Sequence, residues 1–270
     1  MRDRAAYVHG YDERENARLC DQASTLAELL HAGTAYPDGS RVLEAGCGVG
    51  AQTVTLARHS RGASIISIDF SETSLDQARR AVDAANITNV TFLRADVFHL
   101  PFPPESFDHV FVCFLLEHLT HPVVALRALK RLLRPRGTIT VVEGDHGSTY
   151  FHPDSEAARQ AVKCLVELQK RAGGNSLIGR ELYPRMVEAG FEDVEVSPRM
   201  VYVDSSKPHM VEGFTKKTFT AMVEGVRSAA LSEGLLDPVT FDRGISDLYR
   251  TAALDGVFCY TFFKGIAVKS

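Results

Sequence analysis

The chain has 270 residues, of which 45% are hydrophobic and 24% are charged, which suits one enlarged globular domain with a sizeable core. Its net charge of −4 excludes a strong basic field that would draw it to nucleic acid or an anionic membrane. The sequence lacks a long apolar run and begins with polar residues, so neither a membrane span nor a signal peptide is predicted, and five scattered cysteines without C-x-x-C pairs predict reduced thiols in the cytoplasm.

The first predicted element is an amphipathic helix over residues 12–32, where apolar residues recur at helical spacing. A glycine-rich stretch follows it between residues 42 and 52. This stretch reads as an apolar strand end, the acid Glu44, and then glycines at positions 46, 48 and 50 ahead of a helix start. Glycine lets a ligand approach the main chain closely, and an apolar strand feeding such a loop predicts a nucleotide site at the carboxyl edge of a sheet.

The spacing of these glycines does not fit two common phosphate loops. A dinucleotide fingerprint needs its third glycine at position 51, which is Ala51 in this chain. The Lys-Ser/Thr pair that completes a phosphate loop is also missing after Gly50. The loop therefore indicates a different nucleotide-like ligand.

Three further strand-like segments follow in order. Residues 63–71 contain a strand-like run that ends at Asp69. This acid lies 19 residues after Gly50, where a neighbouring strand end can offer a carboxylate to ribose hydroxyls. Residues 90–97 contain Asp96, and residues 107–114 look like a fourth strand. A turn and a fifth strand over residues 132–143 continue the alternation of strands and helices, which predicts a parallel, doubly wound α/β sheet.

The last third of the chain is predicted to contain helices over residues 155–172 and 180–189 and strands over residues 194–203 and 257–268. A hairpin would suffice between those two strands, yet residues 205–256 lie there and are patterned as helices. Connections of this length are usually functional or fold into elements of their own. We expect this insertion to form a cap over an acceptor pocket, and a dimerisation surface or additional core is the alternative.

Together, the glycine motif E-x-G-x-G-x-G and the later segments resemble class I S-adenosylmethionine-dependent methyltransferases over residues 40–145. The resemblance implies one domain with a Rossmann-like, seven-stranded, doubly wound sheet. Residues 1–35 would then form an N-terminal helical lid, residues 36–204 and 257–270 the core, and residues 205–256 the helical cap.

The resemblance also implies S-adenosyl-L-methionine as cofactor. In that family the acid at position 44 orients the amino acid part of the cofactor, Asp69 binds the ribose, Phe70 packs on the adenine, and Asp96 accepts from the adenine amino group. Structural alternatives are that Glu44 accepts loop amides, Asp69 caps the following helix and Asp96 caps a turn. The complete predicted cofactor set is Glu44, Gly46, Cys47, Gly48, Gly50, Gln52, Asp69, Phe70, Ser71, Asp96, Val97 and Phe114.

Three clusters are candidates to face the transferred methyl group. The first is Glu117 with His118, just past the fourth strand. The second is Tyr7 with Tyr11, whose rings could close over a sulfonium or orient the acceptor. These four are the predicted catalytic residues, with a plain helix start and a packed N-terminal arm as the alternatives. The third cluster, residues 143–152, follows the fifth strand, and its histidines lack a well-spaced partner set, so no metal is predicted.

The functional prediction is a cytoplasmic methyltransferase for a small molecule, without nucleic-acid or membrane partners and with a homodimer left open. The acceptor is predicted to be a nitrogen heteroaromatic of indole or imidazole type, a specialised metabolite methylated on carbon or nitrogen, because the cap and the N-terminus are rich in aromatic residues. A thiol or phenol acceptor is the alternative. A nicotinamide-dependent oxidoreductase and a non-catalytic cofactor-binding protein are the rival classes. The chain also lacks the Asn/Asp-Pro-Pro-Tyr segment of exocyclic-amine methyltransferases.

Overall fold

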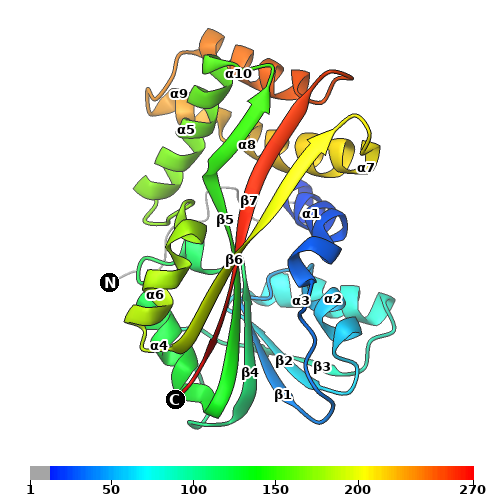
Figure 1. The fold of residues 1–270 in the computed structure, drawn as a ribbon, viewed down its shortest axis with the longest axis vertical. Helices are drawn as coiled ribbons and strands as arrows, with labels where there is room; N and C mark the ends of the chain where they lie inside the picture. Colours follow the sequence, from blue (N-terminus) through cyan, green and yellow to red (C-terminus); the bar gives the residue numbers. More distant parts are fainter. Residues whose placement is uncertain (1–12) are drawn as a thin grey trace.

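The computed structural model describes residues 13–270, apart from the side chains of residues 13–17 and 19–21 in the first helix. Its centre is a seven-stranded sheet of order β3-β2-β1-β4-β5-β7-β6 (Figure 1). Strands β1 to β5 run parallel, and β7 runs antiparallel to both of its neighbours. The strands are β1 (Arg41–Ala45), β2 (Ser64–Asp69), β3 (Val90–Arg94), β4 (Phe107–Cys113), β5 (Leu133–His152), β6 (Glu192–Asp204) and β7 (Val257–Val268). The predicted Rossmann-like fold class is confirmed.

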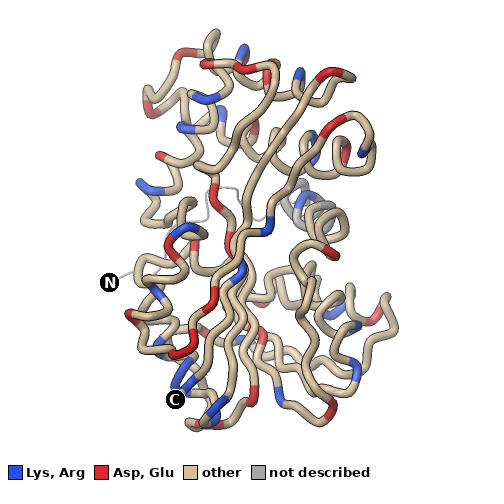
Figure 2. Tube along the Cα trace, viewed as in Figure 1, with Lys and Arg blue, Asp and Glu red and all other residues tan. Residues whose placement is uncertain are grey.

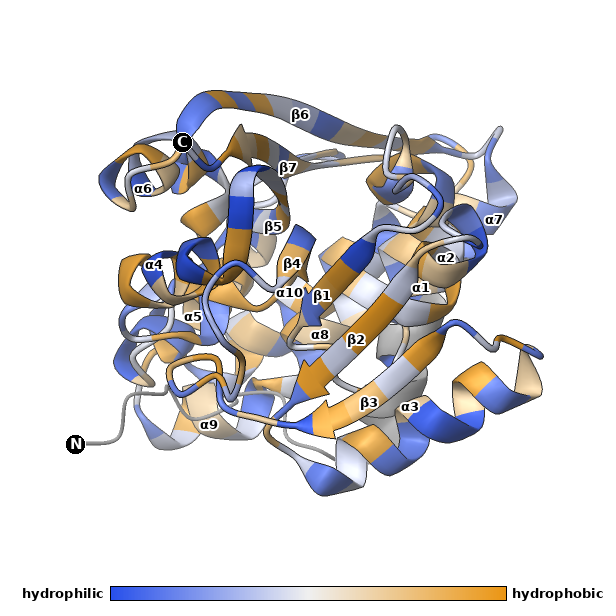
Figure 3. Ribbon diagram, turned by 90° about the horizontal axis from the view of Figure 1, so that it is seen from below, coloured by the Kyte–Doolittle hydropathy of each residue, from blue (hydrophilic) through white to orange (hydrophobic). Residues whose placement is uncertain are grey.

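Helices cover both faces of this sheet. Figure 1 shows α1 (Glu13–His31), α2 (Thr53–His59) and α3 (Glu72–Ala84) on one side and α4 (Pro122–Leu132) and α6 (Leu182–Glu188) on the other. Two apolar cores result, one on each face. Seen from below, β1, β2 and β3 carry apolar stretches at the centre, whereas α3 alternates apolar and polar residues (Figure 3). Amphipathic helices on an apolar parallel sheet produce this layering.

Strand β5 is longer than its sequence predicted. It was expected to end near residue 143, but it continues to His152, because Tyr150, Phe151 and His152 pair with the β7 residues Cys259, Phe258 and Val257. A register irregularity separates Asp145 from Tyr150. The expectation that residues 144–152 follow the strand is therefore wrong. Together β5, β6 and β7 extend well beyond the ends of β1 to β4 (Figure 1).

The insertion after β6 folds into short helices over this extension. They are α7 (Pro208–Met210), the π-helix η3 (Val211–Thr220), α8 (Ala221–Gly225), α9 (Arg227–Ser232) and α10 (Pro238–Arg250). With α5 (Glu156–Arg171) they cover the upper part of the sheet (Figure 1). We call the helices of the insertion, α7, η3, α8, α9 and α10, the cap.

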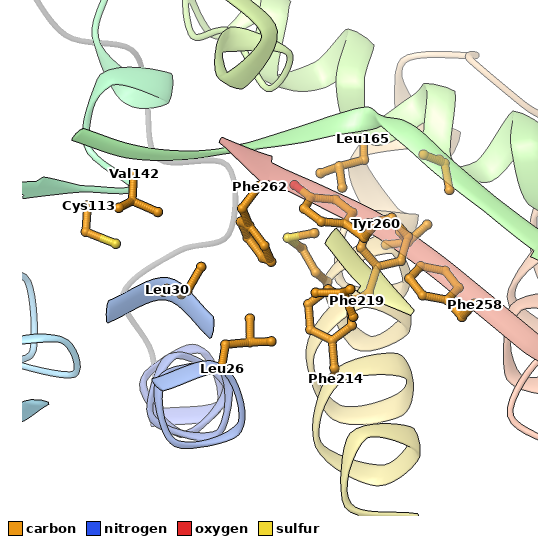
Figure 4. Packing of buried hydrophobic residues seen from close by; sticks show 14 of the residues in the cluster. Leu26, Leu30, Cys113, Val142, Leu165, Phe214, Phe219, Phe258, Tyr260 and Phe262 are labelled. Atoms are coloured by element: carbon orange, nitrogen blue, oxygen red, sulfur yellow. The ribbon is translucent and has the colours of Figure 1, made fainter. Parts of the chain in front are cut away.

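The aromatic residues of the cap and β7 are core residues. Phe219 contacts Phe258 and Tyr260 with ring centroids 4.9 and 5.5 Å apart, and Tyr260 lies 4.6 Å from Phe262. These four rings and Phe214 are at most 2% exposed. Figure 4 shows them packed together beside Leu26 and Leu30 of α1. Burying each such ring stabilises the fold by roughly 1.5–3 kcal/mol, so they fill space and do not line an open aromatic pocket.

Charged residues of both signs are interspersed along the chain, without a long tract of one sign (Figure 2). Within residues 13–270, none of the helices combines the length and apolar character needed to span a membrane.

Candidate active site

The glycine loop lies between β1 and α2. Gly46, Gly48 and Gly50 all have positive φ angles, of 76°, 52° and 80°. A Cβ at Gly46 would lie 2.8 Å from the Leu115 side chain, and a Cβ at Gly50 would lie 2.8 Å from the Ala78 Cα atom. A Cβ at Gly48 would meet no atom within 4 Å. The outer glycines therefore permit close packing, whereas the middle glycine faces open space where a ligand can lie against the backbone.

Glu44 lies beneath this loop and is 2% exposed. Its Oε2 atom accepts hydrogen bonds from the Thr53 hydroxyl at 2.8 Å and the Ser67 hydroxyl at 2.6 Å. Burial raises the pKa of Glu44 to about 7, and the nearby charge of Asp69 adds to the rise. The carboxyl thus ties β1 to α2 and β2 through hydroxyl donors, not through the loop amides considered from the sequence.

Asp69 ends β2 beside the loop. Its Oδ2 atom accepts from the Gly48 amide at 3.0 Å, and its Oδ1 atom accepts from the Ser71 amide at 2.9 Å. Ser71 in turn caps α3, because its hydroxyl accepts from the Ser74 amide at 3.2 Å. The Phe70 ring next to Asp69 is 43% exposed. A carboxylate and an exposed aromatic ring therefore stand together at the open side of the loop.

The other predicted cofactor residues lie at neighbouring strand ends. Asp96 follows β3, and its Oδ1 atom accepts from the Phe98 amide at 3.0 Å, which is the turn considered from the sequence. Val97 is 4% exposed. Phe114, just after β4, has a positive φ of 55° and donates its amide to Val142 O at 2.9 Å.

Two loop residues have structural contacts. Cys47 is 7% exposed, and burial raises the pKa of its thiol well above its usual range, so it is a packing residue. Gln52 Oε1 lies 2.8 Å from His31 Nε2 and links the loop to the end of α1. Burial lowers the pKa of His31 to about 4, so this imidazole is neutral at pH 7.

These groups fit a cationic amino acid joined to a nucleoside better than a pyrophosphate. Asp69 beside the loop would repel a pyrophosphate and attract an ammonium group, and Glu44 below the loop would do the same in its charged form. The open backbone at Gly48 and the exposed Phe70 ring supply room and a stacking surface.

A second group of polar residues is buried just past the end of β4 and along β5. Glu117 lies in the short 3₁₀ helix η1 (Leu116–His118), where its Oε2 atom accepts from Gln169 Nε2 at 3.0 Å and its Oε1 atom is 3.6 Å from His118 Nε2. Glu143 is fully buried, and its Oε1 atom accepts from the Leu115 and Leu116 amides at 3.0 and 2.7 Å. Burial, together with the charge of Glu117, raises the pKa of Glu143 well above its usual range.

His146 lies further along β5 and is 6% exposed. Its Nδ1 atom is 2.8 Å from the Tyr260 hydroxyl, and its amide donates to Ser176 O at 2.9 Å. Burial lowers the pKa of His146, so the ring is neutral. The neighbouring Asp145 forms a bidentate ion pair with Arg180, in which Nε donates to Oδ2 at 2.6 Å and Nη2 donates to Oδ1 at 2.8 Å. Within residues 13–270 the structure contains no group of His, Cys, Asp or Glu side chains suited to a metal ion.

Four atoms of this group are buried without a hydrogen-bond partner: Glu143 Oε2, His146 Nε2, Gln169 Oε1 and Ser176 Oγ. We call Glu117, Glu143, His146, Gln169 and Ser176 the polar cluster. Each unpaired atom costs about 1–3 kcal/mol, and buried polar atoms are normally paired. The cluster therefore has donors and acceptors available for a bound molecule.

A family model described as "Methyltransferase domain" matches residues 43–141. An uncharacterized 37.1 kDa protein of transposon TN4556 from Streptomyces fradiae is 32% identical over 212 residues, which are 77% of this chain but only 60% of that protein's length. The S-adenosyl-L-methionine-dependent Diels-Alderase iccD of Talaromyces variabilis is 30% identical over 220 residues, covering 74% of this chain and 73% of the relative. This chain belongs to the S-adenosylmethionine-dependent methyltransferase family.

Other family members agree with this assignment. The 27-O-demethylrifamycin SV methyltransferase of Amycolatopsis mediterranei is 28% identical over 228 residues, covering 83% of this chain and 76% of the relative. The fold is similar to that of a Haemonchus contortus phosphoethanolamine N-methyltransferase solved with S-adenosylhomocysteine, with a TM-score of 0.56 and 20% identity over 91% of this chain and 52% of that chain. S-adenosylmethionine is accordingly the cofactor of this family member.

The predicted catalytic residues are only partly visible. Glu117 and His118 lie next to each other at the end of β4, and Glu117 is a member of the polar cluster. Tyr7 and Tyr11 lie outside the described residues. Gln169 and Ser176 were not predicted from the sequence, because they lie near the end of α5 and in the loop after it, far from the motifs. The available signal was the uncharged Gln169, which lies on the same face of α5 as the apolar residues Val162, Leu165 and Leu168.

Proposed function

We propose that this methyltransferase methylates a hydroxyl group of a small molecule that is bound against the polar cluster. The preferred acceptor is an aromatic hydroxyl. The observation that carries this proposal is the set of four buried, unpaired polar atoms on β5, on α5 and in the loop after α5. An acceptor that carries both a hydroxyl and a neighbouring polar group would pair several of them at once.

The cofactor would be held by the glycine loop and the strand ends next to it. We propose that Gly48 faces its methionine part, that Asp69 accepts from the ribose hydroxyls and that Phe70 packs on the adenine. Asp96 and Val97 would border the adenine, and the other predicted loop residues would shape the cradle. When bound, S-adenosylmethionine supplies an electrophilic methyl group on a positively charged sulfur.

A hydroxyl must lose its proton during methyl transfer, and the polar cluster offers proton acceptors. In the tautomer whose Nδ1–H donates to Tyr260, Nε2 of His146 carries a free lone pair in a buried site. Because burial lowers the pKa of His146, this ring is neutral at pH 7 and its Nε2 lone pair is not occupied by a proton. Glu117 and its neighbour His118 are a second candidate pair, since their side chains are 12% and 26% exposed.

A nitrogen heteroaromatic is the second acceptor class. Gln169 Oε1 could accept from a ring N–H, so an imidazole or indole fits the polar cluster. The aromatic residues of the cap do not support this class, because they pack against one another as core. The Amycolatopsis relative is named for an O-demethyl substrate, which favours oxygen as the acceptor atom. We further propose a cytoplasmic location and no nucleic-acid substrate, in line with the net charge of −4.

A matched acceptor panel tests the proposal. The protein is incubated with methyl-tritiated S-adenosylmethionine and 2-naphthol, naphthalene-2-thiol, indole or benzimidazole, and labelled product and S-adenosylhomocysteine are both measured. We expect label in the naphthol ether. Label only in benzimidazole or indole would replace the hydroxyl with the heteroaromatic acceptor. Cofactor binding without turnover of any of the four acceptors would contradict the proposed activity.

Variants of the polar cluster make this test specific. His146→Asn and Glu117→Gln should each lower turnover by about 10²-fold or more, the scale of a lost general base, with S-adenosylhomocysteine affinity kept within about twofold. His209→Asn in α7 is the matched control for a histidine outside the cluster. Turnover at the wild-type rate in both cluster variants would remove these residues from the reaction.

A further inference from the structure

A groove outside the cofactor loop and the polar cluster carries an unpaired cation. It has a volume of about 700 Å³ and is lined by Thr25, Leu26, Glu28, Leu29, Ala32, Arg199 and Met210. These residues come from α1, from the edge strand β6 and from α7. The volume lies within the range of small-molecule sites, about 300–1,000 Å³.

The charge at the base of this groove is not balanced by protein groups. Arg199 Nε is buried without a hydrogen-bond partner, and across residues 13–270 no carboxylate forms an ion pair with this guanidinium. Glu28 lines the same groove, but its side chain is exposed and does not reach Arg199 as an ion pair. Leaving the Nε donor in this state is costly, because it has lost water without gaining an acceptor.

A second cation lies behind Arg199. Lys264 on β7 is 1% exposed, and its Nζ atom donates to Ala32 O at 2.8 Å and to the Thr34 hydroxyl, both of which are neutral acceptors. Burial and, to a smaller extent, the positive charge of Arg199 together lower the pKa of Lys264 to about 8. The two side chains therefore favour an anion at this point of the sheet.

The remaining walls of the groove are apolar and are formed by Leu26, Leu29, Ala32 and Met210. Thr25 packs closely on Gly213 of the cap. A Cβ at Gly213 would lie 2.2 Å from the Thr25 hydroxyl oxygen. A planar guanidinium matches the two oxygens of a carboxylate, and an apolar wall favours a hydrocarbon body.

We infer that this groove is a binding site for a small amphipathic carboxylate, whose head group pairs with Arg199 and whose apolar body lies between α1 and Met210. The site lies outside the cofactor loop and the polar cluster, and the inference does not depend on the proposed acceptor.

Isothermal titration calorimetry with octanoate tests the site. Octanoate should bind one-to-one, and neutral 1-octanol should bind about tenfold more weakly or worse, because it lacks the carboxylate. Arg199→Gln should reduce octanoate affinity about tenfold, whereas Arg243→Gln, an exposed arginine of α10, should not. Equal binding of octanoate and octanol, or unchanged octanoate binding by Arg199→Gln, would overturn the inference.

Two further measurements fix the location and keep this site distinct from the cofactor site. Methyl NMR with ¹³C-methionine should show the Met210 signal shifting on octanoate addition while Met186, buried in the opposite core, stays in place. Octanoate should bind the Asp69→Ala variant with wild-type affinity, so failure of the cofactor assignment would leave this test intact. Shifts at Met186 without a shift at Met210 would place the ligand elsewhere and contradict the inference.

Discussion

The buried carboxyl of Glu44 predicts a specific dependence of stability on pH. Its pKa is about 7 in the folded protein against an ordinary 4.5, chiefly because burial disfavours the charged form. As pH rises above 4.5, the unfolded chain releases this proton while the folded protein keeps it until about pH 7. The contribution of Glu44 to stability is therefore full below pH 4.5 and is lost as pH rises through 7.

The magnitude follows from the size of the shift. Linkage gives a cost to folding of about 1 kcal/mol at pH 5 and about 3 kcal/mol at pH 8 from this one group. Glu44→Gln keeps an acceptor for the Thr53 and Ser67 hydroxyls and removes the titration. The stability difference between the variant and the wild type should therefore change by about 2 kcal/mol in favour of the variant from pH 5 to pH 8.

Urea unfolding followed by far-ultraviolet circular dichroism at both pH values measures this difference. Every other titrating group is common to both proteins and cancels. Glu188→Gln, a carboxylate on the surface of α6, controls for loss of a negative charge. A difference between Glu44→Gln and wild type that is the same at pH 5 and pH 8 would refute the argument that Glu44 is buried with a raised pKa.

The same residue tests the proposed contact with the cofactor. If Glu44 faces the ammonium of the ligand, directly or through water, binding favours its charged form and releases a proton near neutral pH. S-adenosylhomocysteine affinity should then rise from pH 6 to pH 8 in the wild type and not in Glu44→Gln. If the affinity for S-adenosylhomocysteine changed with pH in the same way in both proteins, Glu44 would not contact the ligand and would only stabilise the loop.

Further predictions concern three other contacts. Asp69→Ala should weaken S-adenosylhomocysteine binding by about 1.5–3 kcal/mol in calorimetry, and unchanged affinity would remove Asp69 from the site. Gly50→Ala should lower the free energy of unfolding by about 2–4 kcal/mol, because its Cβ would overlap Ala78. Gly48→Ala should lower it by only about 1 kcal/mol and should chiefly weaken ligand binding. Equal losses of unfolding free energy in the two variants would contradict the different roles assigned to these glycines. Arg180→Gln should lower stability by about 2 kcal/mol in urea unfolding by leaving buried Asp145 without its partner, and a loss near zero would contradict that ion pair.

The parts of the fold that sequence reasoning located are governed by local patterns. The apolar strand, the acid and the alternate glycines of residues 42–50 specify a turn whose backbone angles only glycine adopts easily, and the structure has positive φ at all three glycines. The run Val257–Val268 was predicted as a strand with the bounds that the structure gives it. Apolar periodicity and turn chemistry are sufficient for such elements.

The length of β5 and the polar cluster could not be obtained in this way. Residues 144–152 contain two glycines and several polar residues, so their own sequence favours a loop; pairing with β7, more than a hundred residues away, makes part of them a strand. Gln169 and Ser176 meet Glu117 and His146 only because α5 ends beside η1 and β5. Contacts of this kind depend on tertiary packing, which periodicity does not encode.

The division between the glycine loop and the cap has a consequence for specificity. The glycine loop, Asp69 and Glu117 lie within the matched methyltransferase segment, residues 43–141, whereas His146, Gln169, Ser176 and Tyr260 lie beyond it. The groups proposed to receive the acceptor therefore come mainly from the long β5, from α5 and from the cap-covered part of β7. We infer that relatives which share the matched segment share the cofactor cradle, and that differences in β5 and the cap are where a different acceptor would be selected. Exchange of β5 residues 144–152 alone should then alter acceptor choice while leaving cofactor affinity unchanged, because none of the loop contacts of Gly48, Glu44 or Asp69 involves that segment.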